Sequence, residues 1–240
     1  MEKYKKVVYP FFLLINYVTA YSQGSFDSLL EKAVSVYTNI AGPNSHLYNG
    51  SQYVDYDHRI IGNPFFVSSY FSDGSILYDG IFYPHVQMFY EILHDDVVIK
   101  NYNGSPLVLA KEKVYSFNYA GHRFVRLVAD SSETGMKISG FYDVLFDGSI
   151  KLLAKHKKEI VEKISLQYSE SYFAAHDEYY ILKDDVFYPE TDRRSVLYAM
   201  KDKRNEVVKF LHDNKIRFKK DIKTDLIKTS AYYDGLKNIK

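Results

Sequence analysis

The chain has 240 residues, of which 46% are hydrophobic, and it carries a net charge of +1. It contains no cysteine, which excludes disulfides, thiol catalysis, cysteine-ligated zinc and a lipoprotein anchor. The near-neutral charge argues against nucleic acid as a partner, and the aromatic content, 24 Tyr and 16 Phe without Trp, favours half-buried β-strands.

Residues Met1–Ser22 have the composition of a secretory signal peptide. Basic residues precede the apolar run Val7–Ala20, and Ala20 and Ser22 supply the small residues that signal peptidase recognises, so cleavage is expected before Gln23. The run is about 14 residues long, whereas a membrane-spanning helix needs about 20, which disfavours a retained anchor. We expect an exported protein, in the periplasm, at the outer-membrane periphery or outside the cell, with no membrane span after cleavage.

The mature chain begins with an amphipathic segment, Ser25–Ile40, that predicts a helix. Ser25 is a suitable N-cap, and Gly42-Pro43 ends the segment. The helix is expected to pack on a sheet or to plug one end of a barrel. Its apolar side chains recur at helical spacing, at Phe26, Leu29, Leu30, Ala33, Val34, Tyr37 and Ile40.

A short pattern recurs from residue 76 onward: an apolar pair, one spacer, and a turn led by aspartate before the next apolar run. Asp-Gly between apolar runs predicts a two-residue hairpin, because a type I′ turn needs positive φ at both central residues. Asp-Asp suits this turn less well, since a residue with a side chain resists positive φ. Asn103-Gly104 and Ala120-Gly121 are two further expected turns. The four turns led by aspartate are Asp79-Gly80, Asp95-Asp96, Asp147-Gly148 and Asp184-Asp185.

Short apolar or alternating runs between these turns predict the strands of an antiparallel sheet. Sequential hairpins favour an up-and-down meander, open or closed into a barrel. Lys157–Lys163 fits a strand or the start of a helix, and Gln167–Glu178 is expected to be a polar linker. The expected strands are Phe65–Phe71, Ser75–Asp79, Ile81–Tyr83, Val86–Leu93, Val97–Asn101, Pro106–Glu112, Lys113–Tyr119, His122–Val128, Ile138–Phe146 and Ser149–His156, with a last hairpin over Glu178–Tyr188.

The C-terminal segment has helical periodicity. Asp192 is a suitable N-cap, an interruption at Lys203-Arg204 predicts two short helices, and a further helix is expected from Asp221 to a stop at Asp234-Gly235. The expected fold class is mainly β with flanking α. Its parts are a signal peptide at 1–22, a helix plus antiparallel β domain at 23–190, and a basic helical segment at 191–240.

Charge is distributed unevenly along the chain. Residues 192–240 hold 14 Lys and Arg against 7 Asp and Glu, whereas residues 23–191 hold 14 against 22. One interpretation is complementarity within the molecule and solubility. The other is a surface for an anionic envelope component, such as lipid headgroups or polysaccharide. The candidate residues for that surface are Lys203, Arg204, Arg217, Lys219 and Lys220.

No stretch of the sequence carries a recognisable catalytic or phosphate-binding motif. The best candidate for metal binding is Asp55-Tyr56-Asp57-His58, because Asp55 and Asp57 project on one face of an extended strand and His58 follows. A solvated loop whose aspartates cap turns is the favoured alternative. The sequence therefore predicts no cofactor.

Several short segments together resemble a family of uncharacterised exported proteins from Bacteroidota bacteria. The resemblance covers most of the mature chain and implies export, but it brings no activity and no catalytic residue. The segments are Leu47–Gly50 with Tyr53, Gly62–Phe66, Gly121–Phe124, Phe141–Gly148, Tyr179–Lys183 and Tyr232-Tyr233.

These observations favour a non-catalytic envelope protein that binds or scaffolds an envelope protein, a lipid headgroup or a polysaccharide. A barrel that carries a small apolar ligand is one alternative. A hydrolase whose site is assembled from scattered residues is another. Neither the ligand nor the oligomeric state follows from the residues.

Overall fold

The computed structural model describes Lys32 and residues 46–131, 136–164, 169–190 and 192–238. The chain separates into two compact units, Met1–Asn44 and Ser45–Lys240, and all the elements below belong to the second. The predicted signal peptide and the helix expected over Ser25–Ile40 lie outside the described residues, apart from Lys32. Among the described helices, none combines the length and the apolar character needed to cross a bilayer.

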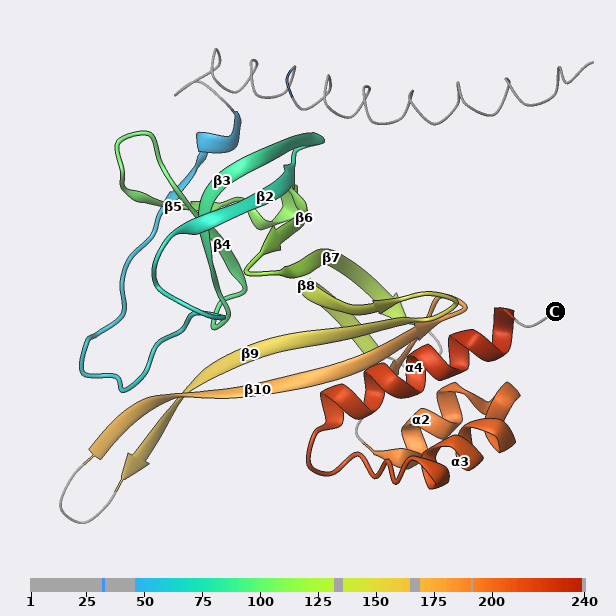
Figure 1. Ribbon diagram of the computed structural model, residues 1–240. Helices are drawn as coiled ribbons and strands as arrows, with labels where there is room; N and C mark the ends of the chain where they lie inside the picture. Colours follow the sequence, from blue (N-terminus) through green and yellow to red (C-terminus); the bar gives the residue numbers. More distant parts are fainter. Residues whose placement is uncertain (1–31, 33–45, 132–135, 165–168, 191, 239–240) are drawn as a thin grey trace, which may run out of the picture. The chain divides into compact units, whose positions relative to one another are not determined.

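One antiparallel sheet of eleven strands forms the body of this unit (Figure 1). In space the strands follow the order β1-β5-β4-β3-β2-β6-β7-β8-β9-β10-β11. The mainly β, antiparallel fold is confirmed, but the sheet stays open and no barrel forms from the described residues. The strands are β1 (Gly50–Gln52), β2 (Ser72–Tyr78), β3 (Ile81–Glu91), β4 (Asp96–Lys100), β5 (Pro106–Leu109), β6 (Val114–Tyr119), β7 (His122–Ser131), β8 (Met136–Asp147), β9 (Lys151–Ile164), β10 (Ser169–Lys183) and β11 (Val186–Pro189).

The sheet contains two meanders rather than one continuous series. Strands β2 to β5 follow one another and β6 to β11 do the same, but β6 pairs with β2 and not with β5. The 3-10 helix η3 (Lys111–Lys113) lies between β5 and β6, and η2 (His46–Tyr48) precedes β1. Turn residues predict local hairpins, but nothing in a turn specifies which distant strand becomes a neighbour.

Left-handed backbone at the hairpin tips explains most of the turn residues. Asp184 and Asp185 have φ values of 51° and 62°, so these two aspartates adopt the two-residue turn despite its steric cost. At the second predicted turn Glu91 pairs with Asp96, so the connection is the loop Ile92–Asp95, and Asp96 already belongs to β4. Reversals are also confirmed at Asp79-Gly80, Asn103-Gly104, Ala120-Gly121 and after Asp147.

The largest departure from expectation is the arm formed by β9 and β10, which extends beyond the rest of the sheet (Figure 1). Lys157–Lys163 continues β9, and most of the expected linker Gln167–Glu178 belongs to β10. The two strands pair as far as Ile164 and Ser169. Exposed side chains occupy both faces of the arm, so no apolar alternation marks these residues as strand.

Two further strand predictions need correction. Phe65–Phe71 is not a strand, because only Phe65 forms an isolated bridge, with Glu91. Its aromatic rings instead cover β3, where Phe65 lies 5.0 Å from the Phe89 ring. The separate runs Ile81–Tyr83 and Val86–Leu93 merge into the single strand β3.

Three helices follow the sheet: α2 (Arg193–Ala199), α3 (Arg204–Asp213) and α4 (Ile222–Asn238), with the 3-10 turn η4 (Lys201–Lys203) between the first two. The predicted cap at Asp192 and the break at Lys203-Arg204 are confirmed. The stop expected at Asp234-Gly235 is wrong, since α4 continues to Asn238. A glycine inside a helix costs about 1 kcal/mol, and fully buried Tyr233 anchors this last part of α4.

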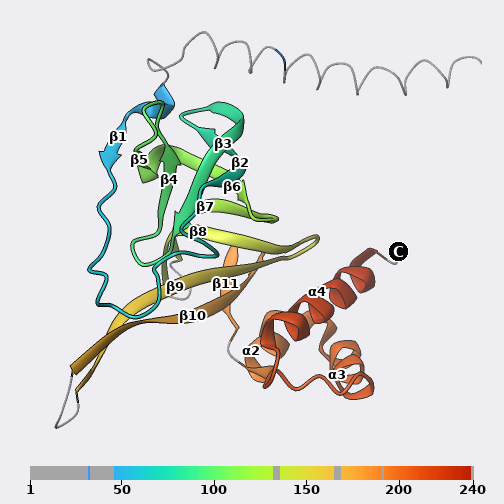
Figure 2. The ribbon, with the colours of Figure 1, turned by 60° about the vertical axis from the view of Figure 1, so that its left-hand side comes forward.

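Two large apolar cores support the fold, together with a small third cluster of Tyr142, Leu153 and Phe187. The first lies within strands β2 to β8 and is rich in aromatic rings, such as the stacked pair Phe117 and Phe124, whose centroids are 4.7 Å apart. The second joins the ends of β8 to β10 to the three helices (Figure 2). Ile181 of β10, Val207 of α3 and Leu226 of α4 are all buried there. The C-terminal helices are therefore packed on the sheet and not a detached tail.

Candidate functional site

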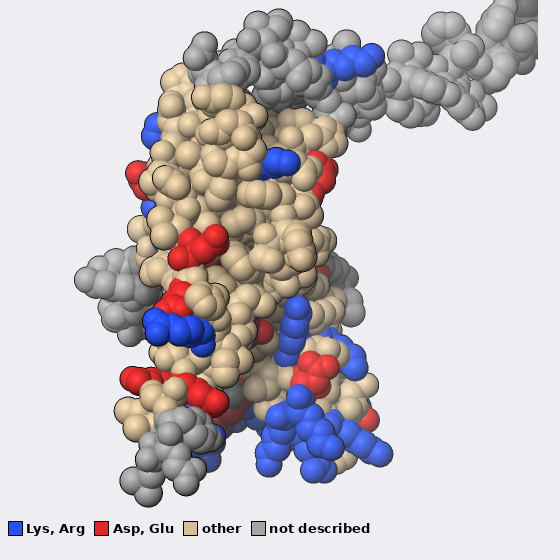
Figure 3. Space-filling view, turned by 90° about the vertical axis from the view of Figure 1, so that its left-hand side faces the viewer, with Lys and Arg blue, Asp and Glu red and all other residues tan. Residues whose placement is uncertain are grey.

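A groove bordered by basic side chains lies on the C-terminal helices, between the start of α2, the start of α3 and the loop that leads to α4. We call it the basic groove, and its volume is about 1020 Å³. In Figure 3, Lys and Arg side chains gather at the lower right, where these helices lie. The groove is lined by the basic residues Arg193, Arg194, Arg204, Arg217 and Lys219, and by the apolar residues Leu197, Tyr198, Val208, Ile216 and Phe218.

The loop between α3 and α4 holds one wall of the groove in place. Ile216 and Phe218 are each 5% exposed and pack into the second core, whereas Arg217 and Lys219 are exposed. Phe218 has a φ of 52°, which is uncommon for a bulky residue, and its backbone N–H donates to Asp225 Oδ2 at 2.9 Å. The anchored loop therefore presents its basic side chains from a fixed backbone.

A capping box fixes the opposite wall. The Asp192 carboxylate accepts hydrogen bonds from the backbone N–H groups of Arg194 and Ser195, at 2.7 and 3.0 Å. The backbone N–H of Asp192 in turn donates to the Ser195 hydroxyl. Asp192 is the one acid among the lining residues, and its carboxylate is engaged by the helix start.

The cations of the basic groove lack ion-pair partners among the described residues. Arg193, Arg194, Arg204, Arg217 and Lys219 form no ion pair with any residue that the structure describes. Elsewhere on the same helical segment, Asp202 contacts two lysines. Although partial burial opposes ionisation, hydrogen bonds from those lysines and a tyrosine hold the pKa of Asp202 well below its usual range. The groove is therefore a local excess of positive charge.

Charge alone predicted part of this surface. Three of the five candidate residues, Arg204, Arg217 and Lys219, line the basic groove, whereas Lys203 and Lys220 are not among its lining residues. Arg193 and Arg194 were not among the predicted residues, although an Arg-Arg pair directly after the Asp192 cap is a visible signal. The apolar floor was not predicted either, because it forms only when α2 and α3 pack together.

The residues proposed from sequence as metal ligands have other partners or lie in solvent. Arg59 donates its backbone N–H to Asp57 at 3.0 Å and also forms an ion pair with it, and these hydrogen bonds lower the pKa of Asp57. The His58 side chain is 97% exposed, and Asp55 is exposed. Asp57 thus stabilises a local turn, which agrees with the alternative weighed for this segment.

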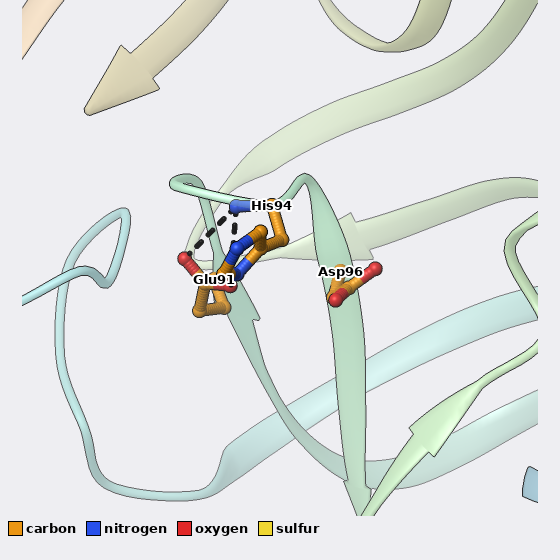
Figure 4. Close-up of side chains that lie close together, drawn as sticks. All are labelled: Glu91, His94 and Asp96. Carbon is orange, nitrogen blue, oxygen red and sulfur yellow. Dashed lines mark hydrogen bonds and ion pairs between the residues drawn. The ribbon is translucent and has the colours of Figure 1, made fainter. Parts of the chain in front are cut away.

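A different group of potential metal ligands converges at the loop between β3 and β4, where single atoms of Glu91, His94 and Asp96 lie within 4.8 Å of one another. Figure 4 shows hydrogen bonds between Glu91 and His94 and none to Asp96. Burial raises the pKa of Glu91, and hydrogen bonds from backbone N–H groups oppose this. Lys111 lies 3.2 Å from Asp96. Because protein groups engage each of these ligands, the geometry favours a structural loop over a metal site.

A row of histidines and aspartates crosses four consecutive strands, β7 to β10. His122 Nδ1 lies 2.7 Å from Asp143 Oδ2, His156 Nε2 lies 3.2 Å from the same oxygen, and His156 Nδ1 lies 2.7 Å from Asp177. Both ring nitrogens of His156 lie within hydrogen-bonding distance of carboxylates, an arrangement that favours the imidazolium form. Burial lowers the pKa of His156, but the two carboxylates outweigh it and the net pKa is raised. Because carboxylates engage both of its ring nitrogens, His156 is poorly placed to act as a general base.

Comparison with family models, with curated proteins and with solved structures finds no match to this chain. The lining of the basic groove combines five cations with an apolar floor and lacks a free carboxylate or imidazole. This combination suits the binding of an anion better than acid–base chemistry.

Proposed function

We propose that this chain is a non-catalytic exported protein that binds an anionic component of the cell envelope in the basic groove. The observation that carries the proposal is the convergence of five cations, without ion pairs to described residues, above an apolar floor. Four of the five are arginines, whose planar guanidinium groups suit two-point contacts with phosphate or carboxylate. The apolar floor adds contact area that a simple surface charge lacks.

The placement in the envelope rests on the sequence. Basic residues followed by an apolar run at Met1–Ser22 support export, and the resemblance of several segments to exported Bacteroidota proteins points to the same compartment. The open sheet disfavours the alternative of an apolar ligand enclosed in a barrel. The engagement of both nitrogens of His156 disfavours a hydrolase built on the histidine row.

A binding experiment with a matched control tests the proposal. The purified protein is presented to three separate probes: vesicles containing phosphatidylglycerol, immobilised dextran sulfate, and envelope proteins coupled to beads. The variant Arg204→Glu with Arg217→Glu changes two groove residues. The control Lys209→Glu with Lys228→Glu makes the same change in net charge on exposed lysines of α3 and α4 outside the groove lining.

The proposal expects the natural protein and the control to bind at least one probe, and the groove variant to lose that binding. If the groove variant and the control bind every probe equally well, the groove is not the binding site and the proposal is wrong. Circular dichroism of all three proteins shows whether each remains folded, so a loss of binding cannot be mistaken for unfolding.

A further inference from the structure

We propose that the partner of the basic groove is the phosphodiester of an anionic membrane phospholipid, so that the C-terminal helices dock on a lipid surface. This assignment rests on the proposed function, since it names the chemistry of the ligand at the same groove. Three features of the described residues carry it: the hydrogen-bonding character of the lining, the apolar floor and an exposed tyrosine at the rim.

The polar side chains of the groove are almost entirely donors. Arginine and lysine donate hydrogen bonds and accept none, and the carboxylate of Asp192 accepts two hydrogen bonds from the start of α2 through Oδ1, which leaves Oδ2 as an acceptor. The Tyr198 hydroxyl is the one other acceptor among the lining side chains. A well-matched ligand therefore supplies acceptors and brings few donors of its own.

This requirement separates the candidate anions. A polysaccharide brings many hydroxyl groups, and a peptide brings backbone N–H groups, whereas the groove side chains offer acceptors only at Asp192 and Tyr198. A phosphodiester carries a full negative charge and only acceptor oxygens. Two or more arginines around such a group form charge-assisted hydrogen bonds, which are stronger than those between neutral groups.

The apolar floor indicates that the anion is attached to hydrocarbon. Leu197, Ile216 and Phe218 line the groove but are each only 5% exposed, so most of its open apolar surface belongs to half-buried Val208 and exposed Tyr198. A free phosphate ion or a soluble phosphodiester would leave this apolar surface against water, whereas the glycerol and first methylene groups of a lipid would cover it.

Tyr198 supports docking on a membrane rather than capture of a lipid from solution. Its ring is 62% exposed at the rim, and the Lys201 ammonium lies 5.7 Å from the ring centroid. Tyrosine is enriched where a membrane meets water, because its apolar ring and polar hydroxyl suit that boundary. Lys201, Lys203 and Lys220 extend the positive charge near the groove, which favours an anionic surface.

Co-sedimentation with vesicles tests the assignment. One set of vesicles contains phosphatidylglycerol in phosphatidylcholine, and the other contains phosphatidylcholine alone. We expect binding to the first set only, with at least about tenfold weaker binding for Arg204→Glu with Arg217→Glu. The control Lys209→Glu with Lys228→Glu should retain most of the affinity, because its charge change lies outside the groove. Soluble glycerophosphoglycerol, added as a competitor, should not displace the protein.

Each contrary outcome has a distinct meaning. Equal binding to both vesicle sets, or an equal loss for the control variant, would overturn docking through the groove. Displacement by low millimolar glycerophosphoglycerol would assign the groove to a soluble phosphodiester. It would overturn the proposal that the groove docks on a membrane. Groove-dependent binding to dextran sulfate or to an envelope protein without binding to vesicles would overturn the lipid assignment while leaving the proposed function in place.

Discussion

The buried charges of the sheet and the cations of the basic groove are organised in opposite ways. In the sheet, the Lys155 ammonium lies 2.6 Å from Asp95 Oδ2 and donates to the Phe141 carbonyl at 3.0 Å. Tyr90 and the backbone N–H of Phe141 donate to the same aspartate. In the groove, five cations share a surface with no ion pair to any described residue.

The difference follows from burial. Lys155 is 5% exposed, and an uncompensated buried charge costs about 3–5 kcal/mol, so the sheet has to pair it. The groove arginines are exposed to water, where an isolated charge costs little and an ion pair contributes about 0–1 kcal/mol. Folding therefore explains the pairing in the sheet, whereas it gives no reason to gather five cations in one groove. The proposed anionic ligand would supply that reason.

The largest expected effect comes from breaking the buried pair. Asp95→Ala leaves the Lys155 ammonium and the Tyr90 hydroxyl without their partner. We expect the free energy of unfolding in urea to fall by about 3–5 kcal/mol. The double variant Asp95→Ala with Lys155→Met should recover part of this loss, because no lone charge remains. A double variant no more stable than the single one would show that the lost charge pairing is not the cause.

Glu190 provides the next test. Among the described acidic residues, it is the one whose pKa burial raises far above its ordinary value. Burial raises the pKa of Glu190 from 4.5 to about 8, and repulsion from Asp192 adds to this, while the nearby Ser195 hydroxyl opposes it. The unfolded chain releases this proton near pH 4.5 and the folded chain near pH 8. Stability should therefore fall as pH rises through this window, by up to about 1.4 kcal/mol per pH unit.

Replacing that carboxyl with an amide removes the titration. Glu190→Gln should flatten the dependence of the unfolding free energy on pH between 5 and 8, as measured by urea unfolding at each pH. An unchanged slope in the variant would mean that Glu190 is ionised in the folded protein across this range.

A smaller dependence on pH comes from His156. Its pKa is raised in the folded protein, so its contribution to stability is present below the unfolded value of 6.5 and is lost as pH rises through the folded value. The loss of stability between these two pKa values amounts to about 1.4 kcal/mol for each unit of pKa shift. In the Glu190→Gln background, His156→Leu should remove this loss. NMR titration of the His156 ring gives the pKa directly, and a value below 6.5 would contradict the imidazolium assignment.

The smallest expected effect is in the groove itself. Arg204→Gln with Arg217→Gln should change the free energy of unfolding by less than about 0.5 kcal/mol, because these exposed side chains form no ion pair with described residues. Urea unfolding at constant pH measures this change. A loss of more than about 1 kcal/mol would mean that the two arginines support the fold, and the contrast with the sheet would fail.

The turns of the sheet could be predicted from sequence because their chemistry is local. Asp79-Gly80 and Asp184-Asp185 identify hairpins within a few residues of the chain, and both are found. The pairing of β6 with β2 joins strands that are distant in the sequence, and no residue near either strand predicts it. The arm was missed for another reason: it has solvent on both faces, so Gln167–Glu178 lacks the apolar alternation by which a strand is recognised.

The basic groove was predictable in charge and not in shape. The excess of Lys and Arg after Asp192 is visible in the sequence, and Arg204, Arg217 and Lys219 follow from it. Their convergence depends on how α2 packs against α3 and on the left-handed backbone at Phe218. Both features arise from tertiary contacts, so a count of charges along the chain also selected Lys203 and Lys220, which lie outside the lining.

A single fluorescent reporter tests the central claim, that the basic groove binds an anionic lipid surface. The chain contains no tryptophan, so Tyr198→Trp places one such fluorophore at the rim of the groove. Vesicles containing phosphatidylglycerol should shift its emission to shorter wavelength, whereas phosphatidylcholine vesicles should not, and adding Arg204→Glu with Arg217→Glu should abolish the shift. An emission spectrum that anionic vesicles leave unchanged, or shift equally with and without the two arginines, would contradict the account.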